Sequence, residues 1–581
     1  MNPNTKSDRK PDILYKVGSR NPGSRFLDIE IKVATKGKSS FNVALPTWRP
    51  GRYELGNFAK FIRGFKVKDA NQKEVAFKKV SSHVWLIASG DVKFVTISYQ
   101  FYTTELNAGS SWVDKNQLYI NPVNCLMYVV SRESEHCTIS FDVPDSYNIA
   151  TGLKREGSTF SAANFDELAD SPIICSPNLQ HKTYNVSGVI FNIWFQGDLK
   201  PNWEKLIKDF KAFTGKQLRA MGDFPFNEYH FLFQILPHKG YHGVEHLNST
   251  VISLGPDKEV MKPKLYDELL GVSSHELYHA WNVKSIRPAD MVPYDFSKEN
   301  YTEMGYLTEG VTTYMGDLFL IKSKVFNLKK YIIEIHKLLD RHSFNYGKYN
   351  YSVCESSFDT WLDGYTKGIP NRKTSIYTEG ALLALCIDIM LISESGGKQN
   401  LDTVMKTLFD DYAKKGIGIT EEIFIATIKV QGGLFINDLF DNFYHKAVDY
   451  FDLLKSTFNK VGFVLKKEDN SNELAGRFGC YTDKKGKVLL VAPESPAYSK
   501  GINVGDQILS VNKAKVIGKE WSENIGENQT LELKKVIGSE TVDLGANSSS
   551  KQGPYFEKYR LSEITEKNDN QIKNRIKWLG K

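Results

Sequence analysis

The first third of the chain alternates apolar and polar residues with a period of two. The alternation recurs in short segments separated by turn-forming clusters, among them FLDIEIKVAT, FNVAL, KFVTISYQFY and CTISFDV. Successive side chains of a strand point to opposite faces, so this alternation predicts strands with one buried face. A series of short strands without long helical stretches predicts an antiparallel β-sandwich, which we assign to residues 1–180.

A different periodicity begins near residue 181. Two strand-like segments, VIFNIWF and YHFLFQIL, are followed by stretches in which apolar residues recur every three or four positions, such as WEKLIKDFKAFTG, LKKYIIEIHKLLDRH and LDTVMKTLFDDYAKK. This spacing places the apolar side chains on one face of a helix. A few strands followed by a mainly helical block predict an α+β domain over residues 181–455.

A further compact segment is assigned to residues 456–545. Within it, Ser495 is typical of a helix N-cap, Pro496 of the first helical position and Gly501 of a helix end. Residues 546–581 are predicted to form a polar tail that ends in a lysine-rich, helix-like piece. The whole chain is therefore expected to be a multidomain α+β protein.

Length and composition narrow the function classes. A chain of 581 residues is too long for one hydrophobic core, which predicts roughly three or four domains. The 75 basic and 68 acidic residues are spread along the chain without a dense Lys/Arg block, so we expect no nucleic-acid partner. The longest apolar run, ALLALCIDIMLI, is too short to span a bilayer and contains Asp388, so we expect a core helix and no transmembrane segment.

The cysteines and the N-terminal residues bear on the redox state and the location of the protein. The six cysteines are scattered without a CxxC pair, which is typical of buried thiols. The N-terminal residues MNPNTKSDRKPD contain no apolar segment that resembles a signal peptide. We expect a cytoplasmic location if Met1 is the native start, and a periplasmic or exported one if a signal peptide was removed.

The segment SHELYHAW carries the strongest chemical signal in the chain. His275 and His279 are four residues apart, and on a helix this spacing places both imidazoles on one face. Glu276 lies beside them, within reach of a water molecule on a metal held by the two histidines. An HExxH motif on a helix predicts a catalytic zinc site with its base built in.

A second pair of histidines, in the segment HGVEH, matches the inverted motif HxxEH. Glycines interrupt the segment, and apolar β-like runs flank it on both sides, so we expect a strand. Residues four apart in a strand are separated by roughly 13 Å, which is too far for one zinc ion. We therefore expect no metal site at His242 and His246.

A zinc site needs a third protein ligand. Asn282 and Ser285 stand where the extended motif HExxHxxGxxH requires glycine and histidine, so an acidic residue from the following segment is required. The candidates are Glu309, then Glu303, and more weakly Asp290 and Asp295. Their spacing from the motif favours Glu309 only slightly over Glu303.

Several motifs together resemble the glycyl aminopeptidase family of zinc metallopeptidases. The segments that carry the resemblance are SHELYHAWNVKSIRP, NYTEMGYLTEGVTTYMGDL, LPTWRPGRYELGNFAKF and GYHGVEHLNST, and SPAYSKGINVGDQILSVN resembles a PDZ domain. They occur in the family's order and span residues 25–543. The resemblance implies a thermolysin-like catalytic domain behind the β-sandwich and a PDZ-like domain near the C-terminus.

The resemblance also implies roles for individual residues. It implies that His275, His279 and Glu309 bind zinc and that Glu276 is the general base, which later passes its proton to the leaving amine. It also implies that Tyr377, in IYTEGALLAL, donates a hydrogen bond to the tetrahedral oxyanion. Here the sequence departs from the family, since residue 379 is a glutamate where lysine is usual.

The strand GYHGVEH is implied to align the substrate. Glu245 would bind the free α-amino group, and Gly243 would lie beside the substrate backbone. His242 stands where the family tends to have a small residue, and a ring there would narrow the pocket. In the PDZ-like domain the loop GRFGCY, residues 476–481, would hold the C-terminus of a peptide, or the domain would pack on the catalytic domain without a ligand.

The leading functional hypothesis is a zinc aminopeptidase that acts on peptides with a free N-terminus, and the family implies a preference for small N-terminal residues. A zinc endopeptidase on the same scaffold is the first alternative. An inactive binding protein that recruits partners through the PDZ-like domain is the second, and the intact zinc motif argues against it. The chain contains no GxSxG segment that would support a serine hydrolase.

Overall fold

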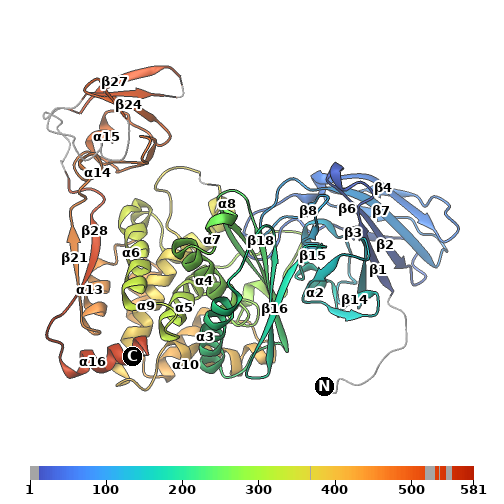
Figure 1. Cartoon of the computed structure of the whole chain (residues 1–581), viewed down its shortest axis with the longest axis horizontal. Coiled ribbons are helices and arrows are strands. Elements are labelled where there is room, and N and C mark those ends of the chain that lie inside the picture. Colours follow the sequence, from blue (N-terminus) through green and yellow to red (C-terminus); the bar gives the residue numbers. More distant parts are fainter. Residues whose placement is uncertain (1–11, 367, 517–529, 536, 545–552, 581) are drawn as a thin grey trace.

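The computed structural model describes residues 12–366, 368–516, 530–535, 537–544 and 553–580. The chain forms an elongated molecule with a β-rich N-terminal domain at one end, a central sheet backed by helices, and a small C-terminal unit on a two-stranded ribbon (Figure 1). The α+β architecture predicted from the periodicities is confirmed.

The N-terminal domain contains three sheets. Their strand orders are β13-β14-β11-β1-β2-β7-β4, β10-β3-β6-β5 and β12-β15-β9-β8. The bounds are β1 (Ile13–Gly18), β2 (Phe26–Ala34), β3 (Phe41–Ala44), β4 (Ile62–Asp69), β5 (Phe77–Lys79), β6 (Val84–Ile87), β7 (Phe94–Tyr102), β8 (Trp112–Val113), β9 (Leu118–Ile120), β10 (Tyr128–Val129), β11 (Cys137–Asp142), β12 (Asn148–Ala150), β13 (Lys154–Glu156), β14 (Thr159–Ala162) and β15 (Ile173–Ser176).

Alternation explains the core of this domain. In β2 the residues Leu27, Ile29, Ile31 and Val33 are buried, and the intervening residues face outward or lie half-buried. Strands β2 and β7 pair antiparallel with Ile31 opposite Ile97, so that both side chains enter the same core. The pairing of β1 with β11 is parallel and departs from the antiparallel expectation. Two short helices, α1 (Pro122–Cys125) and α2 (Phe165–Ala169), complete the domain.

The catalytic domain begins with a five-stranded sheet. Its order is β16 (Gln180–Val186), β17 (Val189–Gln196), β18 (Glu228–Ile235), β20 (Ser249–Gly255) and β19 (Gly240–His246). The three inner strands run parallel and the two outer strands pair antiparallel with them. The segment GYHGVEH is therefore the edge strand β19, as its sequence predicted.

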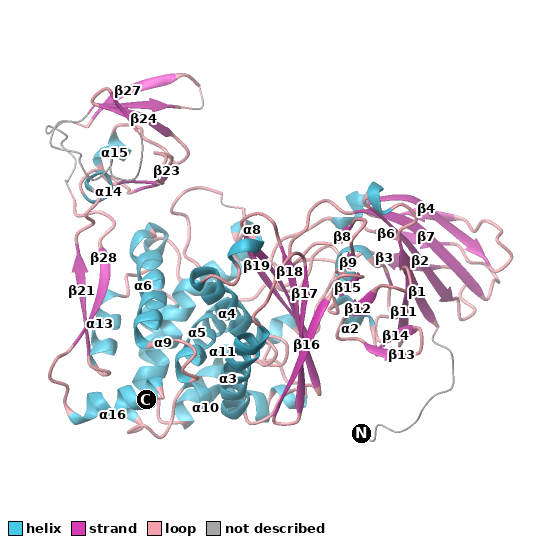
Figure 2. Ribbon diagram, viewed as in Figure 1, coloured by secondary structure: helices cyan, strands magenta, loops and turns pink. Residues whose placement is uncertain are grey.

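Helices cover the sheet and form the rest of this domain (Figure 2). They are α3 (Trp203–Met221), α4 (Pro263–Tyr278), α5 (Thr312–Lys322), α6 (Leu328–Phe344), α7 (Val353–Phe358), α8 (Thr360–Asp363), α9 (Ile376–Glu394), α10 (Leu401–Asp411), α11 (Glu421–Val430), α12 (Ile436–Leu439) and α13 (Phe451–Asn459), with the π-helical segments η5 (Tyr306–Val311) and η8 (Phe440–Tyr444). Within the described residues, α9 is the one helix long and apolar enough to cross a membrane, and 83% of its apolar window is buried inside the protein. It is the core helix that the sequence predicted.

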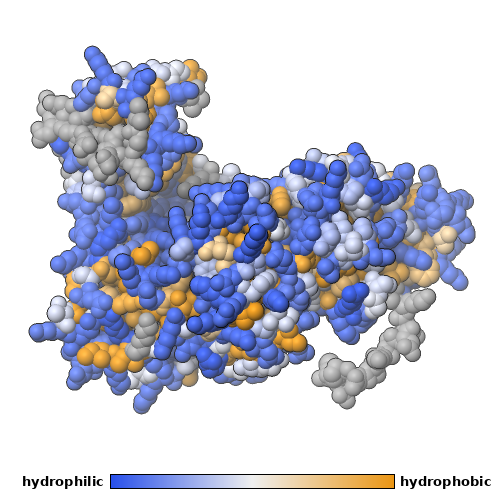
Figure 3. Space-filling model, viewed as in Figure 1, coloured by the Kyte–Doolittle hydropathy of each residue, from blue (hydrophilic) through white to orange (hydrophobic). Residues whose placement is uncertain are grey.

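The PDZ-like unit is carried on the ribbon formed by β21 (Phe463–Glu468) and β28 (Lys558–Glu563), which pair antiparallel. It stands above the catalytic domain and leaves a notch beside it (Figure 3). Its described elements are α14 (Glu473–Gly476), β22 (Cys480–Thr482), β23 (Val488–Val491), α15 (Pro496–Ser499), β24 (Gln507–Val511), β25 (Ala514–Lys515), β26 (Thr530–Lys534) and β27 (Ser539–Asp543). Ser495 caps α15 by accepting a hydrogen bond from the Tyr498 amide, as predicted.

The residues expected to form a tail return to the catalytic domain. They contain β28 and α16 (Asp569–Leu579), and the Trp578 side chain is completely buried. The Trp578 indole donates a hydrogen bond to the Tyr314 hydroxyl on α5, and that hydroxyl in turn donates to Asp388 on α9. The PDZ-like unit is therefore an insertion between two segments that both belong to the catalytic body.

Candidate active site

The last turn of α4 presents both histidines of the HELYH segment to one space. Pro263 starts the helix at its first position, and Leu269, Leu270 and Leu277 anchor it in the core. The Nε2 atoms of His275 and His279 lie 3.0 Å apart. The helical spacing predicted from the sequence therefore brings the two imidazoles together.

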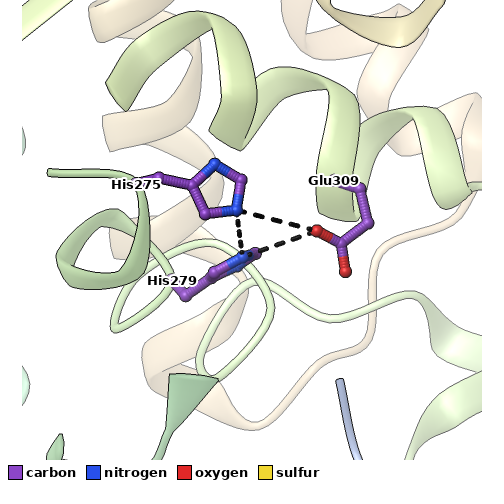
Figure 4. A group of neighbouring side chains, drawn as sticks. All are labelled: His275, His279 and Glu309. Atoms are coloured by element: carbon purple, nitrogen blue, oxygen red, sulfur yellow. Dashed lines mark hydrogen bonds and ion pairs between the residues drawn. The ribbon is translucent and has the colours of Figure 1, made fainter. Parts of the chain in front are cut away.

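Glu309 completes this group from the π-helical segment η5. Its Oε2 atom lies 3.5 Å from His279 Nε2 and 3.9 Å from His275 Nε2 (Figure 4). The three ligand atoms all lie within 4.8 Å of one another. Glu303 belongs to no such group among the described residues, and Asp295 is bonded to Ser297. The structure thus brings Glu309, rather than its competitors, to the histidines.

Glycines set the spacing between the segments that carry these ligands. A Cβ atom on Gly310 would lie 2.4 Å from the Cα atom of Gly380, so η5 packs directly against the backbone of α9. A Cβ atom on Gly316 would lie 2.9 Å from the Cα atom of His275, so α5 packs equally closely against α4. Larger side chains at these positions would move Glu309 away from the histidines.

The chemistry of the donor set fits a zinc ion. His279 Nδ1 lies 2.8 Å from the Asn282 carbonyl oxygen and donates to it, which leaves its Nε2 atom as an acceptor. The Asn282 amide donates to Leu307 O and Thr312 Oγ1, which ties the residues after α4 to the segment that carries Glu309. Imidazole lone pairs and a carboxylate that converge in a buried space match a His₂Glu zinc site.

Glu276 faces the edge strand β19. A Cβ atom on Gly243 would lie 2.2 Å from Glu276 Oε1. Glu276 Oε2 is buried and has no hydrogen-bond partner among the described residues. Burial raises the pKa of Glu276, the Glu245 and Glu309 carboxylates add to this, and His279 opposes it. A carboxyl with a raised pKa and an unused oxygen is suited to accept a proton.

Glu245 lies on the same strand as Gly243, two residues further on. A carboxylate oxygen of Glu245, one of Glu276 and a ring nitrogen of His279 all lie within 4.8 Å of one another. On the other side a Cβ atom on Gly51 would lie 2.4 Å from Glu245 Oε2, so a loop of the N-terminal domain covers this carboxylate. Glu245 is therefore held between the two domains, beside the predicted metal site.

His242 points away from Gly243, because successive residues of a strand face opposite sides. Burial lowers its pKa to about 3, and the charges of Arg49 and Arg52 add to this effect, so the ring is neutral at pH 7. The ring does not enter the space between Gly243 and Glu276. The narrowing expected from the sequence therefore does not apply on that side of the strand.

Tyr377 lies in the first turn of α9 and lines a cavity of about 770 Å³ together with His275 and Glu276. Burial raises its pKa well above the ordinary value, and Glu309 and Tyr365 add to this, so the hydroxyl stays protonated. The departure at Glu379 has a structural reason, because its Oε2 atom lies 2.6 Å from His342 Nδ1 inside the protein. Glu379 faces this buried histidine instead.

Sequence reasoning missed three residues around the site. Tyr53 is buried, and burial raises the pKa of its hydroxyl; the Glu309 carboxylate is the next largest influence in the same direction. The Tyr365 hydroxyl donates to the Gly51 carbonyl oxygen at 3.4 Å, and Arg49 is buried close by. The segment WRPGRY was noticed as a family motif, but Tyr365 stands in a loop without any periodic pattern.

Family models match three successive parts of the chain. Residues 14–177 match the Peptidase M61 N-terminal domain, residues 268–383 match the M61 glycyl aminopeptidase model, and residues 452–529 match the PDZ domain. The chain therefore contains both M61 peptidase domains, followed by a PDZ domain. The resemblance to this family, the fold class and the PDZ domain predicted from the sequence are confirmed.

One solved structure agrees with this fold over nearly the whole chain. An aminopeptidase N family protein from Idiomarina loihiensis has 25% sequence identity with this chain and a TM-score of 0.88, and the match covers 98% of this chain and 100% of that one. An M1 zinc metallopeptidase from Deinococcus radiodurans has 13% identity and a TM-score of 0.47, covering 75% of this chain and 94% of that one. A search of curated proteins returned no match.

Proposed function

We propose that this protein is a zinc-dependent aminopeptidase that hydrolyses the N-terminal peptide bond of peptides and prefers small N-terminal residues such as Gly or Ala. The observation that carries the proposal is the position of Glu245. One of its carboxylate oxygens lies within 4.8 Å of a Glu276 carboxylate oxygen and of a ring nitrogen of His279, which is one of the predicted metal ligands. A carboxylate there pairs with a substrate ammonium and measures one residue from the scissile bond.

His275, His279 and Glu309 would hold the zinc ion. Bound zinc would polarise the scissile carbonyl and lower the pKa of the attacking water. The Asn282 carbonyl and Thr312 keep His279 in the tautomer that a metal ligand requires, because Nδ1 carries the proton.

Glu276 would accept the proton of the attacking water and later give it to the leaving amine. Its carboxylate lies beside Gly243 on the substrate strand and within 4.8 Å of a ring nitrogen of His279, so the proton has a short path to either side. The Tyr377 hydroxyl would donate a hydrogen bond to the oxygen that becomes negative during attack. It can serve as a donor because its raised pKa keeps it protonated across the working range.

The edge strand β19 would align the substrate backbone. Its pairing partner β20 occupies only one edge, so a peptide can add to the other edge as a further strand. The space beyond the α-amino group is narrow for two reasons. Gly51 packs against the Glu245 carboxylate, and the Tyr365 hydroxyl donates a hydrogen bond to the Gly51 carbonyl oxygen. This enclosure supports a preference for small N-terminal side chains.

One experiment tests the whole proposal. The purified chain is analysed for metal content and assayed with Gly- and Ala-initiated peptides, each in free and N-acetylated form. We expect about one zinc per catalytic site and turnover of the free peptides only. Equal cleavage of acetylated peptides would establish the endopeptidase alternative, and zinc without any turnover would favour a binding protein.

A peptide C-terminus is the second partner that we propose, at the PDZ domain. Such a domain receives a peptide as an added strand and holds its carboxylate with loop amides. The loop of residues 476–481 leads into β22, which pairs with β23 on one edge. Fluorescence anisotropy with labelled peptides tests this, because amidation of the peptide C-terminus should abolish binding.

A further inference from the structure

Arg49 is a buried cation that forms no direct ion pair with any described residue. The residue is only 4% exposed, and its sole side-chain hydrogen bond among the described residues is a long one of 3.4 Å from Nη1 to the Pro50 carbonyl oxygen. Within that part of the chain, no carboxylate oxygen lies within 4.0 Å of its guanidinium group. Buried arginines are normally paired, because an isolated charge is costly to remove from water.

The guanidinium lines a cavity next to the loop whose Gly51 covers Glu245. The cavity has a volume of about 260 Å³ and is lined by Arg49, Arg52, Gly109, Ser110 and Ser111, among others. Gly109 makes room for the charge, because a Cβ atom there would lie 2.1 Å from Arg49 Nη2. The space around the guanidinium is therefore built into the fold.

Neighbouring charges compensate Arg49 only at a distance, without a direct ion pair among the described residues. Arg52 adds a second positive charge, but its Nη2 atom already pairs with Glu54 at 2.6 Å. Among the groups that influence the pKa of Arg49 are the hydroxyls of Tyr365 and Tyr119, which are neutral at pH 7, and the Glu245 carboxylate. Burial is a larger influence than any of these groups, and it lowers the pKa of Arg49.

Glu245 balances Arg49 only while the substrate is absent. In the proposed aminopeptidase reaction the α-ammonium group of the substrate pairs with Glu245 and cancels its charge. The subsite then holds one uncompensated positive charge in a poorly solvated space, and an anion is the group that stabilises it. The demand for an anion is therefore greatest when the substrate is bound.

We propose that Arg49 anchors an anion-binding pocket next to the subsite for the N-terminal residue. This inference rests on the proposed aminopeptidase function. The ligand is a small singly charged anion, which has two sources. It is either the side-chain carboxylate of an N-terminal Asp or Glu, or a free anion such as chloride that binds beside a small N-terminal residue.

Kinetics distinguish the two sources. Substrates beginning with Asp, Asn and Ala are assayed in a chloride series whose ionic strength is held constant with sodium HEPES. If the substrate supplies the anion, kcat/KM for Asp exceeds that for Asn by on the order of tenfold or more, and Arg49→Met removes the difference. If the solvent supplies it, chloride activates Ala hydrolysis with saturation, and Arg49→Met removes the activation.

A binding measurement keeps the test independent of turnover. Chloride should raise the melting temperature of the zinc-loaded wild-type chain more than that of Arg49→Met at the same ionic strength, if the free anion is the ligand. Gly109→Ala keeps the charge of Arg49 but crowds its guanidinium, so it should weaken the anion effect even if Arg49→Met folds poorly. Arg49→Lys should restore part of it, whereas Arg52→Met should leave it largely in place because Arg52 already has a partner.

Three results would overturn the pocket. One is equal loss of kcat/KM for Asp, Asn and Ala substrates in Arg49→Met, which would make Arg49 a structural counter-charge for Glu245. The others are an absence of both chloride dependence and Asp preference in the wild type, and anion effects that persist in both Arg49→Met and Gly109→Ala. If the wild type hydrolyses no substrate, the proposed aminopeptidase function fails instead, and the thermal measurement still reports on chloride.

Discussion

Gly243 and Glu276 are in such close contact that a single methyl group would not fit between them. A Cβ atom at residue 243 would lie 2.2 Å from Glu276 Oε1 and 2.8 Å from a methyl group of Val272. Strand β19 and helix α4 are therefore held at a distance that only glycine permits. The proposed base and the proposed substrate strand share one contact surface.

Gly243→Ala should consequently displace the Glu276 carboxylate. A shift of about 1 Å at a reacting group costs on the order of 100-fold in rate, so we expect a fall of that size in kcat with zinc content unchanged. Gly271→Ala is the matched control. Gly271 lies on α4, the helix that carries Glu276, and a Cβ atom there meets nothing within 4 Å. Equal activity of the two variants would mean that Glu276 has room to move without loss.

Glu276→Gln tests the base directly. The amide keeps the shape of the side chain but cannot accept a proton, so kcat should fall by about 10²- to 10⁴-fold. Zinc content, measured by atomic emission, should match the wild type because Glu276 is not one of the proposed ligands. A variant with near-normal kcat would transfer the role of base to another group.

Glu309→Ala and Glu303→Ala separate the two acids that sequence spacing could not. Of these two acids, Glu309 is the one that lies beside the histidines, so Glu309→Ala should weaken zinc affinity by about 100-fold or more. Loss of a residue that only hydrogen-bonds to a metal ligand already costs about 10- to 100-fold in affinity. Competition with a chelating dye measures both affinities. Stronger zinc loss in Glu303→Ala would reassign the third ligand.

Tyr377→Phe removes the proposed oxyanion donor and keeps the ring. Loss of one such donor typically lowers kcat by about 100- to 1,000-fold, and KM should change little because the bond forms in the transition state. Tyr365→Phe is the comparison, since its hydroxyl is bonded to the Gly51 carbonyl. A larger loss of kcat in Tyr365→Phe would identify that residue as the donor.

The lowered pKa of Asp449 should make the stability of the protein depend on pH. Burial would raise the pKa of this carboxyl, but the His342 ring, 3.7 Å away, and the ammonium group of Lys348, 2.7 Å away, hold it well below its usual range. Because the pKa of Asp449 is lower in the folded than in the unfolded state, its ionised form stabilises the protein above about pH 4. This stabilisation is lost as the pH falls further. The contribution should be about 1.5 to 3 kcal/mol at pH 6.

Calorimetry of Asp449→Asn checks this. Its melting temperature should lie below that of the wild type at pH 6, and the gap should narrow as the pH is lowered towards 3. Asp452→Asn, at a nearby exposed position, should match the wild type throughout. A gap that stays constant with pH would mean that the carboxylate charge is not what stabilises this network.

Local sequence patterns predicted much of the fold and, within the site, the position of the two histidines on one helical turn. Alternation located the strands of the N-terminal domain, and the spacing of His275 and His279 placed both imidazoles on one helical turn. The choice of Glu309 was not open to such reasoning, because it depends on the contact between Gly310 and Gly380 across two distant segments.

The remaining omissions have the same physical cause. Tyr53 reaches the site from another domain and Tyr365 from an aperiodic loop, so local periodicity does not indicate a role at the site for either residue. Likewise β28 looks like part of a tail until β21, on the far side of the PDZ-like unit, is known to be its partner. Contacts between residues far apart in the chain carry the information that local periodicity lacks.

The ribbon of β21 and β28 dictates how the PDZ-like unit can be removed experimentally. A stop codon placed before the unit would also delete α16, and Trp578 would leave the core between α5 and α9. Glu468 lies opposite Lys558 in the ribbon, so splicing these two residues through a short turn closes a hairpin and leaves the rest of the molecule intact. Excision, and not truncation, is the manipulation that this topology permits.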